Sequence, residues 1–200
     1  MALILALEGC MAAGKTSAAG FVAQSAPEVH VSYERTAETV ERVRARGLDK
    51  RVFADYVEIQ KLWIQNEIDR YERARAYPVT LTDFGAAEIE FYTLCYPKSI
   101  GENWDVEGAL QEDLRRLREC MPRRILFLRA RDETLRARKT ADGTRSRTFF
   151  EHHLQRLMPL KHEWFLQKET VDVMDVDGMT AMEEGRAVLE WVRRCERRFL

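Results

Sequence analysis

The chain alternates short apolar segments with longer segments in which apolar residues recur every three or four positions. The short segments predict strands, and the first is a continuous apolar run, typical of a parallel strand buried on both faces. The long segments predict helices, and Gly47 and Pro78 end two of them. The expected strands are residues 2–7, 29–32, 79–82, 124–128 and 171–176, and the expected helices begin at residue 17 and cover 36–46, 53–76, 108–120, 149–167 and 180–199.

Strands interleaved with helices predict an α/β fold of three layers, with about five mostly parallel strands and helices on both faces of the sheet. The sequence shows no internal repeat, no low-complexity segment and no linker, so residues 1–200 are expected to form one domain. Ligands of such sheets bind beyond the carboxyl ends of the strands. The residues that follow each strand are therefore the first candidates for a site.

Residues 9–16 read Gly-Cys-Met-Ala-Ala-Gly-Lys-Thr and match the phosphate-binding P-loop G-x-x-x-x-G-K-[ST]. A strand before the motif and a helix after it aim backbone N–H groups at a phosphate. We expect Lys15 to reach the β- and γ-phosphates of ATP and the Thr16 hydroxyl to hold Mg²⁺. The predicted ATP contacts are Gly9, Cys10, Met11, Ala12, Ala13, Gly14, Lys15, Thr16 and Ser17, with Arg136 and Asp177 later in the chain.

Charged side chains follow the other expected strands. A phosphoryl transferase needs a carboxylate linked to Mg²⁺, a group that orients or deprotonates the nucleophile, and cations for the transferring charge. Asp83 is the predicted magnesium carboxylate, together with Thr16. A plain helix cap is the alternative for Glu34 and for Asp83. The strand-end residues are Glu34 and Arg35, Asp83, Arg129 and Arg131, and Asp175 and Asp177.

Arginines are dense between residues 129 and 147, where the turn-forming residues 140–144 interrupt them. This pattern favours an Arg-rich lid at approximately residues 131–148 that folds over a bound triphosphate. Arg138, Arg145 and Arg147 are the predicted catalytic cations of the lid, mobile without ligand and ordered with it. A solvated basic face or an RNA-binding stripe is the alternative.

Composition narrows the function class. The chain has 200 residues, 46% of them hydrophobic and 32% charged, with a net charge of −1, which excludes a disordered chain and a membrane protein. The near-zero charge argues against nucleic-acid binding. Four scattered cysteines without zinc spacing predict free thiols in the cytoplasm. His152, His153 and His162 are expected on a helix surface, and the oligomeric state stays open, with a homodimer among the alternatives.

In order and spacing, these motifs resemble those of the deoxynucleoside kinase and thymidylate kinase-like group of P-loop kinases. Residues 7–9 resemble the opening of that family's P-loop, residues 53–57 the start of its substrate-pocket helix, residues 128–147 its lid, and residues 162–166 the helix that follows. The resemblance implies a P-loop kinase fold, ATP and Mg²⁺ as cofactors, a small-molecule acceptor and Glu34 as the general base.

The acceptor is expected against the long helix, with Tyr56 and Trp63 as stacking surfaces. Plain core packing is the alternative for both rings, since they lie at helical spacing. The predicted substrate contacts are Arg35, Asp55, Tyr56, Gln60, Trp63 and Phe84.

Two departures from the family put the acceptor in question. Ala54 stands where deoxynucleoside kinases have a base-reading glutamine, and Asp83-Phe84-Gly85 stands where they have Glu-Arg-Ser. We therefore expect an ATP-dependent phosphotransferase for which the usual deoxynucleosides are poor acceptors, and a nucleotide or an antibiotic-like alcohol is an alternative. A regulatory GTPase would need an Asn-Lys-x-Asp motif, which the sequence lacks. A nucleotide-binding regulatory or interaction protein without turnover stays open.

Overall fold

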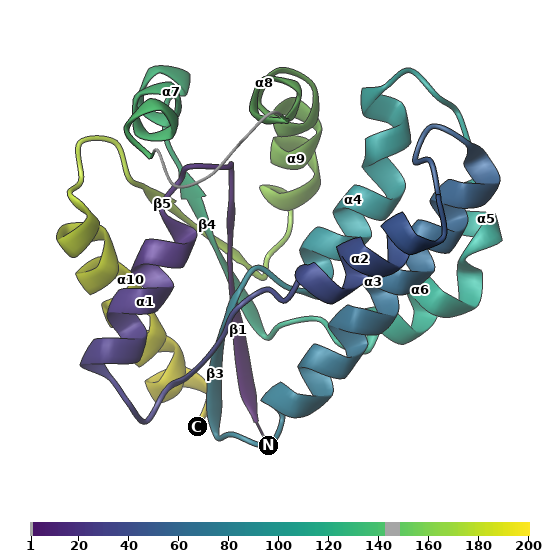
Figure 1. Cartoon of the computed structure of the whole chain (residues 1–200). Coiled ribbons are helices and arrows are strands. Elements are labelled where there is room, and N and C mark those ends of the chain that lie inside the picture. Colours follow the sequence, from purple (N-terminus) through teal and green to yellow (C-terminus); the bar gives the residue numbers. More distant parts are fainter. Residues whose placement is uncertain (1, 143–148) are drawn as a thin grey trace.

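A parallel five-stranded sheet forms the centre of the computed structural model, which describes residues 2–142 and 149–200 (Figure 1). The strand order is β2-β3-β1-β4-β5, and all four strand pairs are parallel. The carboxyl ends of the strands therefore meet at one edge. The strands are β1 (Leu3–Gly9), β2 (His30–Ser32), β3 (Val79–Asp83), β4 (Arg124–Arg129) and β5 (Val171–Asp175).

Helices cover both faces of this sheet, which confirms the three-layer prediction (Figure 1). α1 (Lys15–Ser25) and α10 (Ala181–Phe199) pack together on one face. The other face carries α2 (Ala37–Ala45), α3 (Phe53–Ala74), α4 (Ala86–Ser99), α5 (Val106–Ala109) and α6 (Gln111–Arg118). Above the carboxyl ends of the strands lie α7 (Asp132–Ala141), α8 (Phe150–His152), the π-helical turn η1 (His153–Leu157) and α9 (Met158–Phe165).

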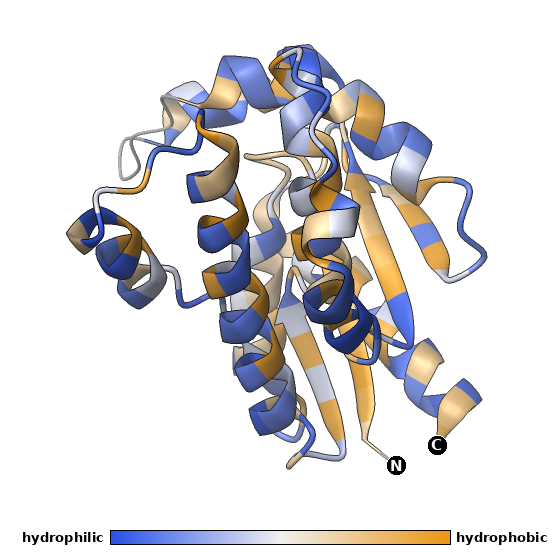
Figure 2. Cartoon of the chain, turned by 90° about the vertical axis from the view of Figure 1, so that its right-hand side faces the viewer, coloured by the Kyte–Doolittle hydropathy of each residue, from blue (hydrophilic) through white to orange (hydrophobic). Residues whose placement is uncertain are grey.

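The central strands are buried on both faces, as their apolar composition predicts. Every residue of β1 and β3 is buried, and Figure 2 shows largely hydrophobic strands at the centre of the fold and helices of mixed hydropathy around them. The two threonines of β3 satisfy their hydroxyls within this core, because Thr80 donates to the carbonyl oxygen of Ala74 and Thr82 to that of Leu5, at 3.0 and 3.1 Å. This core fixes the strand ends that carry the P-loop and Asp83.

Two helical segments differ from the sequence prediction. The expected helix 108–120 breaks at Leu110 into α5 and α6. The helix α4 was not predicted at all, because it is buried on nearly every side and so lacks the polar face that makes helical periodicity visible. Pro97, which lies inside α4, further obscures it.

The expected surface position of His153 is wrong. Its ring is 2% exposed, and Nδ1 lies 2.6 Å from the Tyr92 hydroxyl. Burial lowers the pKa of His153 to about 2, so the ring is neutral. In the described ranges, no three His, Cys, Asp or Glu residues gather as metal ligands, and none of the helices is both long and apolar enough to cross a bilayer.

Candidate active site

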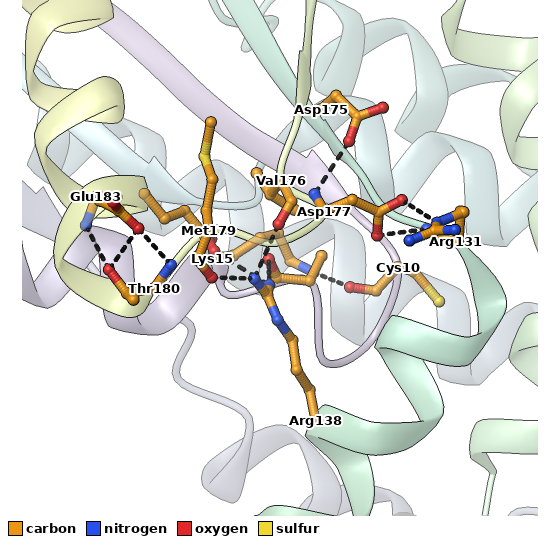
Figure 3. A network of polar contacts seen from close by, with 12 residues as sticks. Cys10, Lys15, Arg131, Arg138, Asp175, Val176, Asp177, Met179, Thr180 and Glu183 are labelled. Carbon is orange, nitrogen blue, oxygen red and sulfur yellow. Dashed lines mark hydrogen bonds and ion pairs between the residues drawn. The ribbon is translucent and has the colours of Figure 1, made fainter.

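The P-loop, residues 9–16, turns sharply between β1 and α1. Gly9 and Gly14 have φ angles of +139° and +105°, which side chains with a Cβ rarely adopt. A Cβ on Gly9 would also lie 2.4 Å from the carbonyl oxygen of Leu128, and one on Gly14 would lie 1.9 Å from Glu184 Oε1. Lys15 Nζ donates to the carbonyl oxygens of Gly9 and Cys10 at 3.2 and 2.8 Å (Figure 3). The loop thus holds its lysine folded back over its own backbone.

Thr16 and Asp83 meet at the end of the central strands. The Thr16 hydroxyl donates to Asp83 Oδ2 at 2.7 Å. Asp83 is the last residue of β3 and pairs in register with Leu7 of β1, which places its carboxylate beside the start of α1. A hydroxyl and one carboxylate are too few to hold a cation alone, but they fit Mg²⁺, which binds one or two protein oxygens together with substrate phosphates.

A single cavity of about 1060 Å³ extends from the P-loop to the walls formed by α3 and α4. We call its two halves the donor end and the acceptor end. The donor end is lined by Gly9, residues 11–17, Arg138, Asp142, Met179, Ala181 and Glu184. The acceptor end is lined by Glu34, Lys50, Tyr56, Ile59, Gln60, Trp63, Phe84, Glu88, Ile89, Tyr92, Tyr96, Phe149 and His153, and Asp83 lies in the lining where the halves meet.

Glu34 follows β2 directly and lines the acceptor end. Partial desolvation by the surrounding walls is the largest effect that raises its pKa to about 7, and the negative charges of Asp83 and Glu88 add to it. The positive charges of Arg70 and Lys15 oppose the rise. The side chain is nevertheless exposed, and its open surface faces the solvent within the cavity. Glu34 is therefore a candidate contact for a molecule bound in this cavity.

Several predicted substrate contacts are brought together at the acceptor end. Gln60, Trp63 and Phe84 line the cavity. Gln60 Oε1 accepts a hydrogen bond from the Thr93 hydroxyl at 2.9 Å, which orients the amide. Tyr56 also belongs to the wall, but it is 1% exposed and its hydroxyl donates to backbone carbonyls of α4. Tyr56 therefore lies in the cavity wall, as predicted, and is also packed in the core, which was the alternative.

Other predicted contacts lie outside the cavity lining. Asp55 Oδ2 accepts from the backbone N–H of Asp49, and Arg35 is exposed. Of the predicted ATP contacts, Cys10 is buried behind the P-loop, Arg136 pairs with Glu151, and Asp177 accepts hydrogen bonds from Arg131. Arg145 and Arg147 lie outside the described residues.

The interpretation of Ala54 as a pocket position is wrong. Ala54 is exposed and does not line the cavity. The first turn of α3 therefore lies away from the acceptor end, and the glutamine that faces it is Gln60, further along the same helix. The part of the sequence argument against deoxynucleosides that rests on Ala54 therefore loses its basis.

Arg138 contacts the P-loop and the segment that precedes α10. Its guanidinium donates to the carbonyl oxygens of Ala13, Val176 and Met179 at 2.9 to 3.1 Å, and it pairs with Glu184 at 3.1 Å (Figure 3). Arg138 thus joins α7 to the P-loop and to the segment before α10.

Sequence reasoning missed a buried ionic cluster beneath the P-loop. Lys161 is 0% exposed and donates to the carbonyl oxygen of Gly9 at 2.9 Å and to Glu88 Oε1 at 2.5 Å, and its Nζ lies 3.8 Å from Glu8 Oε2. Burial raises the pKa of Glu8, and the nearby Glu88 raises it further. Glu8 is the residue from which the sequence could have predicted this cluster, because a charged residue within a strand buried on both faces requires a partner.

The sequence matches no family model and no curated protein. Solved structures do match it. A thymidylate kinase from Candida albicans aligns with a TM-score of 0.68 at 12% identity over 98% of this chain and 92% of that one. A deoxyadenosine kinase from M. mycoides with bound dCTP aligns with a TM-score of 0.65 at 9% identity over 96% and 100%. The same enzyme with dCMP and dCDP bound gives 0.68 at 9% identity, with the same coverage. The chain has the P-loop fold of nucleoside and nucleotide kinases.

Proposed function

We propose that this protein is an ATP-dependent phosphotransferase that acts on a small acceptor molecule. The observation that carries the proposal is the shared cavity, whose lining includes both the P-loop and Glu34. A protein that only binds nucleotide has no need of a second compartment with a carboxylate facing the phosphates. The fold shared with two kinases supports the same reaction class.

The donor end would hold the triphosphate. Backbone N–H groups of residues 9–16 and the N-terminus of α1 favour anionic oxygens there. Lys15 would exchange its carbonyl partners for the β- and γ-phosphates, since a charged acceptor binds an ammonium more strongly than a neutral carbonyl does. Thr16 and Asp83 would hold Mg²⁺, which neutralises charge that develops on the phosphates.

At the acceptor end, Glu34 would accept the proton of the attacking hydroxyl. The hydroxyl oxygen bonds to the γ-phosphorus, the bond from that phosphorus to the β–γ bridging oxygen breaks, and ADP leaves. A base with a pKa of about 7 suits a reaction near neutral pH. The aromatic walls and the oriented amide of Gln60 suit a planar acceptor such as a nucleoside.

A screen of hydroxyl-bearing acceptors for ATP consumption in the presence of Mg²⁺ tests the proposal. Deoxynucleosides belong in the screen on equal terms with other alcohols, since Ala54 lies outside the cavity. We expect acceptor-dependent ADP formation, lost in Lys15→Ala protein that remains folded. Tight ATP binding without turnover of any acceptor would instead indicate a nucleotide-binding regulatory or interaction protein.

A further inference from the structure

Carboxylates surround the place where the acceptor would meet the donor. Three carboxylates line the cavity, from Glu34 after β2, Asp83 of β3 and Glu88 of α4. Their fields overlap, because both Asp83 and Glu88 raise the pKa of Glu34. The positive charges of Arg70 and Lys15 act on Glu34 in the opposite sense, so the acceptor class depends on whether a cation is free to bind an anionic acceptor.

Besides Lys15, which the P-loop backbone holds and which would turn to the phosphates of ATP, the cations near these carboxylates are Arg70 and Lys161. Arg70 is 3% exposed, pairs with Glu67 at 2.8 Å, and donates to the carbonyl oxygens of Asp83 and Phe84 at 3.3 and 2.5 Å. It does not line the cavity. Lys161 is fully buried and bound to Glu88 and the P-loop backbone. Neither cation offers a free hydrogen-bond donor to the acceptor.

Phe84 covers the guanidinium of Arg70. The Phe84 side chain lines the cavity, whereas Arg70 Cζ lies 5.6 Å from the centre of its ring. Phe84 has a φ angle of +44°, an uncommon conformation for a bulky residue, which fixes the ring at this point directly after β3. An apolar ring thus forms the wall where a cation would be needed to bind an anionic acceptor.

Lys50 is the cation that lines the acceptor end in the part of the chain that the structure describes. It is exposed, and its ammonium lies 4.9 and 4.8 Å from the ring centres of Tyr96 and Phe149. A hydrated ammonium is a point charge and lacks the planar fork with which a guanidinium binds a phosphate through two parallel hydrogen bonds. Since Glu88 is already paired with Lys161, Lys50 would have to offset Glu34 and Asp83 at this end of the cavity.

We propose that the acceptor is an alcohol without a phosphate group, either uncharged or cationic, and that Phe84 is a specificity-determining residue that disfavours phosphate monoesters. This inference rests on the proposed phosphotransferase activity and selects one of its two acceptor classes. A monoester would add negative charge to the part of the cavity that Glu34 and Asp83 line. Electrostatic repulsion between these charges should lower kcat/KM for the monoester by roughly 100-fold relative to the matched alcohol.

The test uses acceptors in matched pairs, each alcohol with its own phosphate monoester. Thymidine with thymidine 5′-monophosphate and deoxyadenosine with its 5′-monophosphate are two such pairs, and an aminoglycoside serves as a cationic alcohol. With saturating ATP and Mg²⁺, we expect the wild-type protein to phosphorylate at least one alcohol and to use the paired monoester at least about 100-fold less well. A monoester used as well as its alcohol, or better, would overturn the inference and leave the kinase proposal intact.

Two variants test the role of Phe84. Phe84→Arg places a guanidinium on the cavity wall and should narrow the ratio of alcohol to monoester turnover by about tenfold or more. Phe84→Leu keeps the wall apolar and should preserve the ratio, even if its overall rate falls. An unchanged ratio in folded Phe84→Arg would remove Phe84 as the determinant. Absence of wild-type turnover with every pair would reject both the kinase proposal and the inference. If a variant fails to fold, the ratios measured with the wild-type protein decide the acceptor class.

Discussion

Replacement of Lys161 by methionine should destabilise the protein strongly. The ammonium is fully buried, and it contacts Glu88 Oε1 at 2.5 Å, the Gly9 carbonyl oxygen at 2.9 Å and Glu8 Oε2 at 3.8 Å. Methionine fills a similar volume but leaves two buried carboxyl groups without their cation. Removal of one partner from a buried ion pair costs about 3–5 kcal/mol. Urea unfolding, followed by tryptophan fluorescence, measures the loss directly.

The pH dependence of this loss tests its cause. Without Lys161 the pKa of Glu8 in the folded state rises further above its value in the unfolded chain, so the folded state binds protons more tightly. Stability of the variant is then gained as the pH falls and lost as it rises through those pKa values. The deficit relative to the wild type should therefore shrink toward acidic pH.

A second substitution provides the matched control. Glu88→Gln in the Lys161→Met background removes one uncompensated charge and should restore about 2 kcal/mol at neutral pH. A loss below about 1 kcal/mol in Lys161→Met, independent of pH, would refute the idea that this cluster carries charge within the core.

Two further predictions concern the donor end. Asp83→Asn should weaken the Mg²⁺ dependence of turnover far more than nucleotide binding without metal, because Asp83 meets the Thr16 hydroxyl at the expected metal position; superimposable Mg²⁺ titrations would remove it from the site. Gly14→Ala should lower the free energy of unfolding in urea by about 1–3 kcal/mol, because alanine is strained at a φ of +105°, and it should weaken ATP binding. Adding Glu184→Ala should recover only the part of this loss that comes from the clash with Glu184 Oε1. Full recovery would show that the backbone at residue 14 is not strained.

The fold followed from patterns that depend on short stretches of sequence. A parallel strand buried on both faces needs an unbroken apolar run, and residues 2–7 provide one directly before the P-loop. The N-terminus of α10 was equally readable, since Thr180 and Glu183 form a capping box there. In contrast, α4 is buried on so many sides that its sequence shows no amphipathic period.

The acceptor end was less accessible to sequence reasoning because it depends on packing between distant segments. Helical spacing placed Gln60 and Trp63 on α3 but gave no means to decide which turn of that helix faces the cavity, and Ala54 was assigned to it wrongly. Glu88 and His153 come from α4 and η1, and their buried partners lie 73 and 61 residues away along the chain. Such pairings follow from the tertiary fold.

The most direct test of the central claim compares the wild-type protein with Glu34→Gln, which keeps the shape of the side chain and removes its basicity. At saturating ATP and acceptor, kcat should fall by about 10²–10⁴-fold while the Kd for ATP is unchanged. Because the base must be deprotonated to act, wild-type turnover should rise with pH through about 7, and the variant should lose that rise. A preserved kcat in Glu34→Gln, with the same pH profile as the wild type, would contradict the assignment of Glu34 and the reaction built on it.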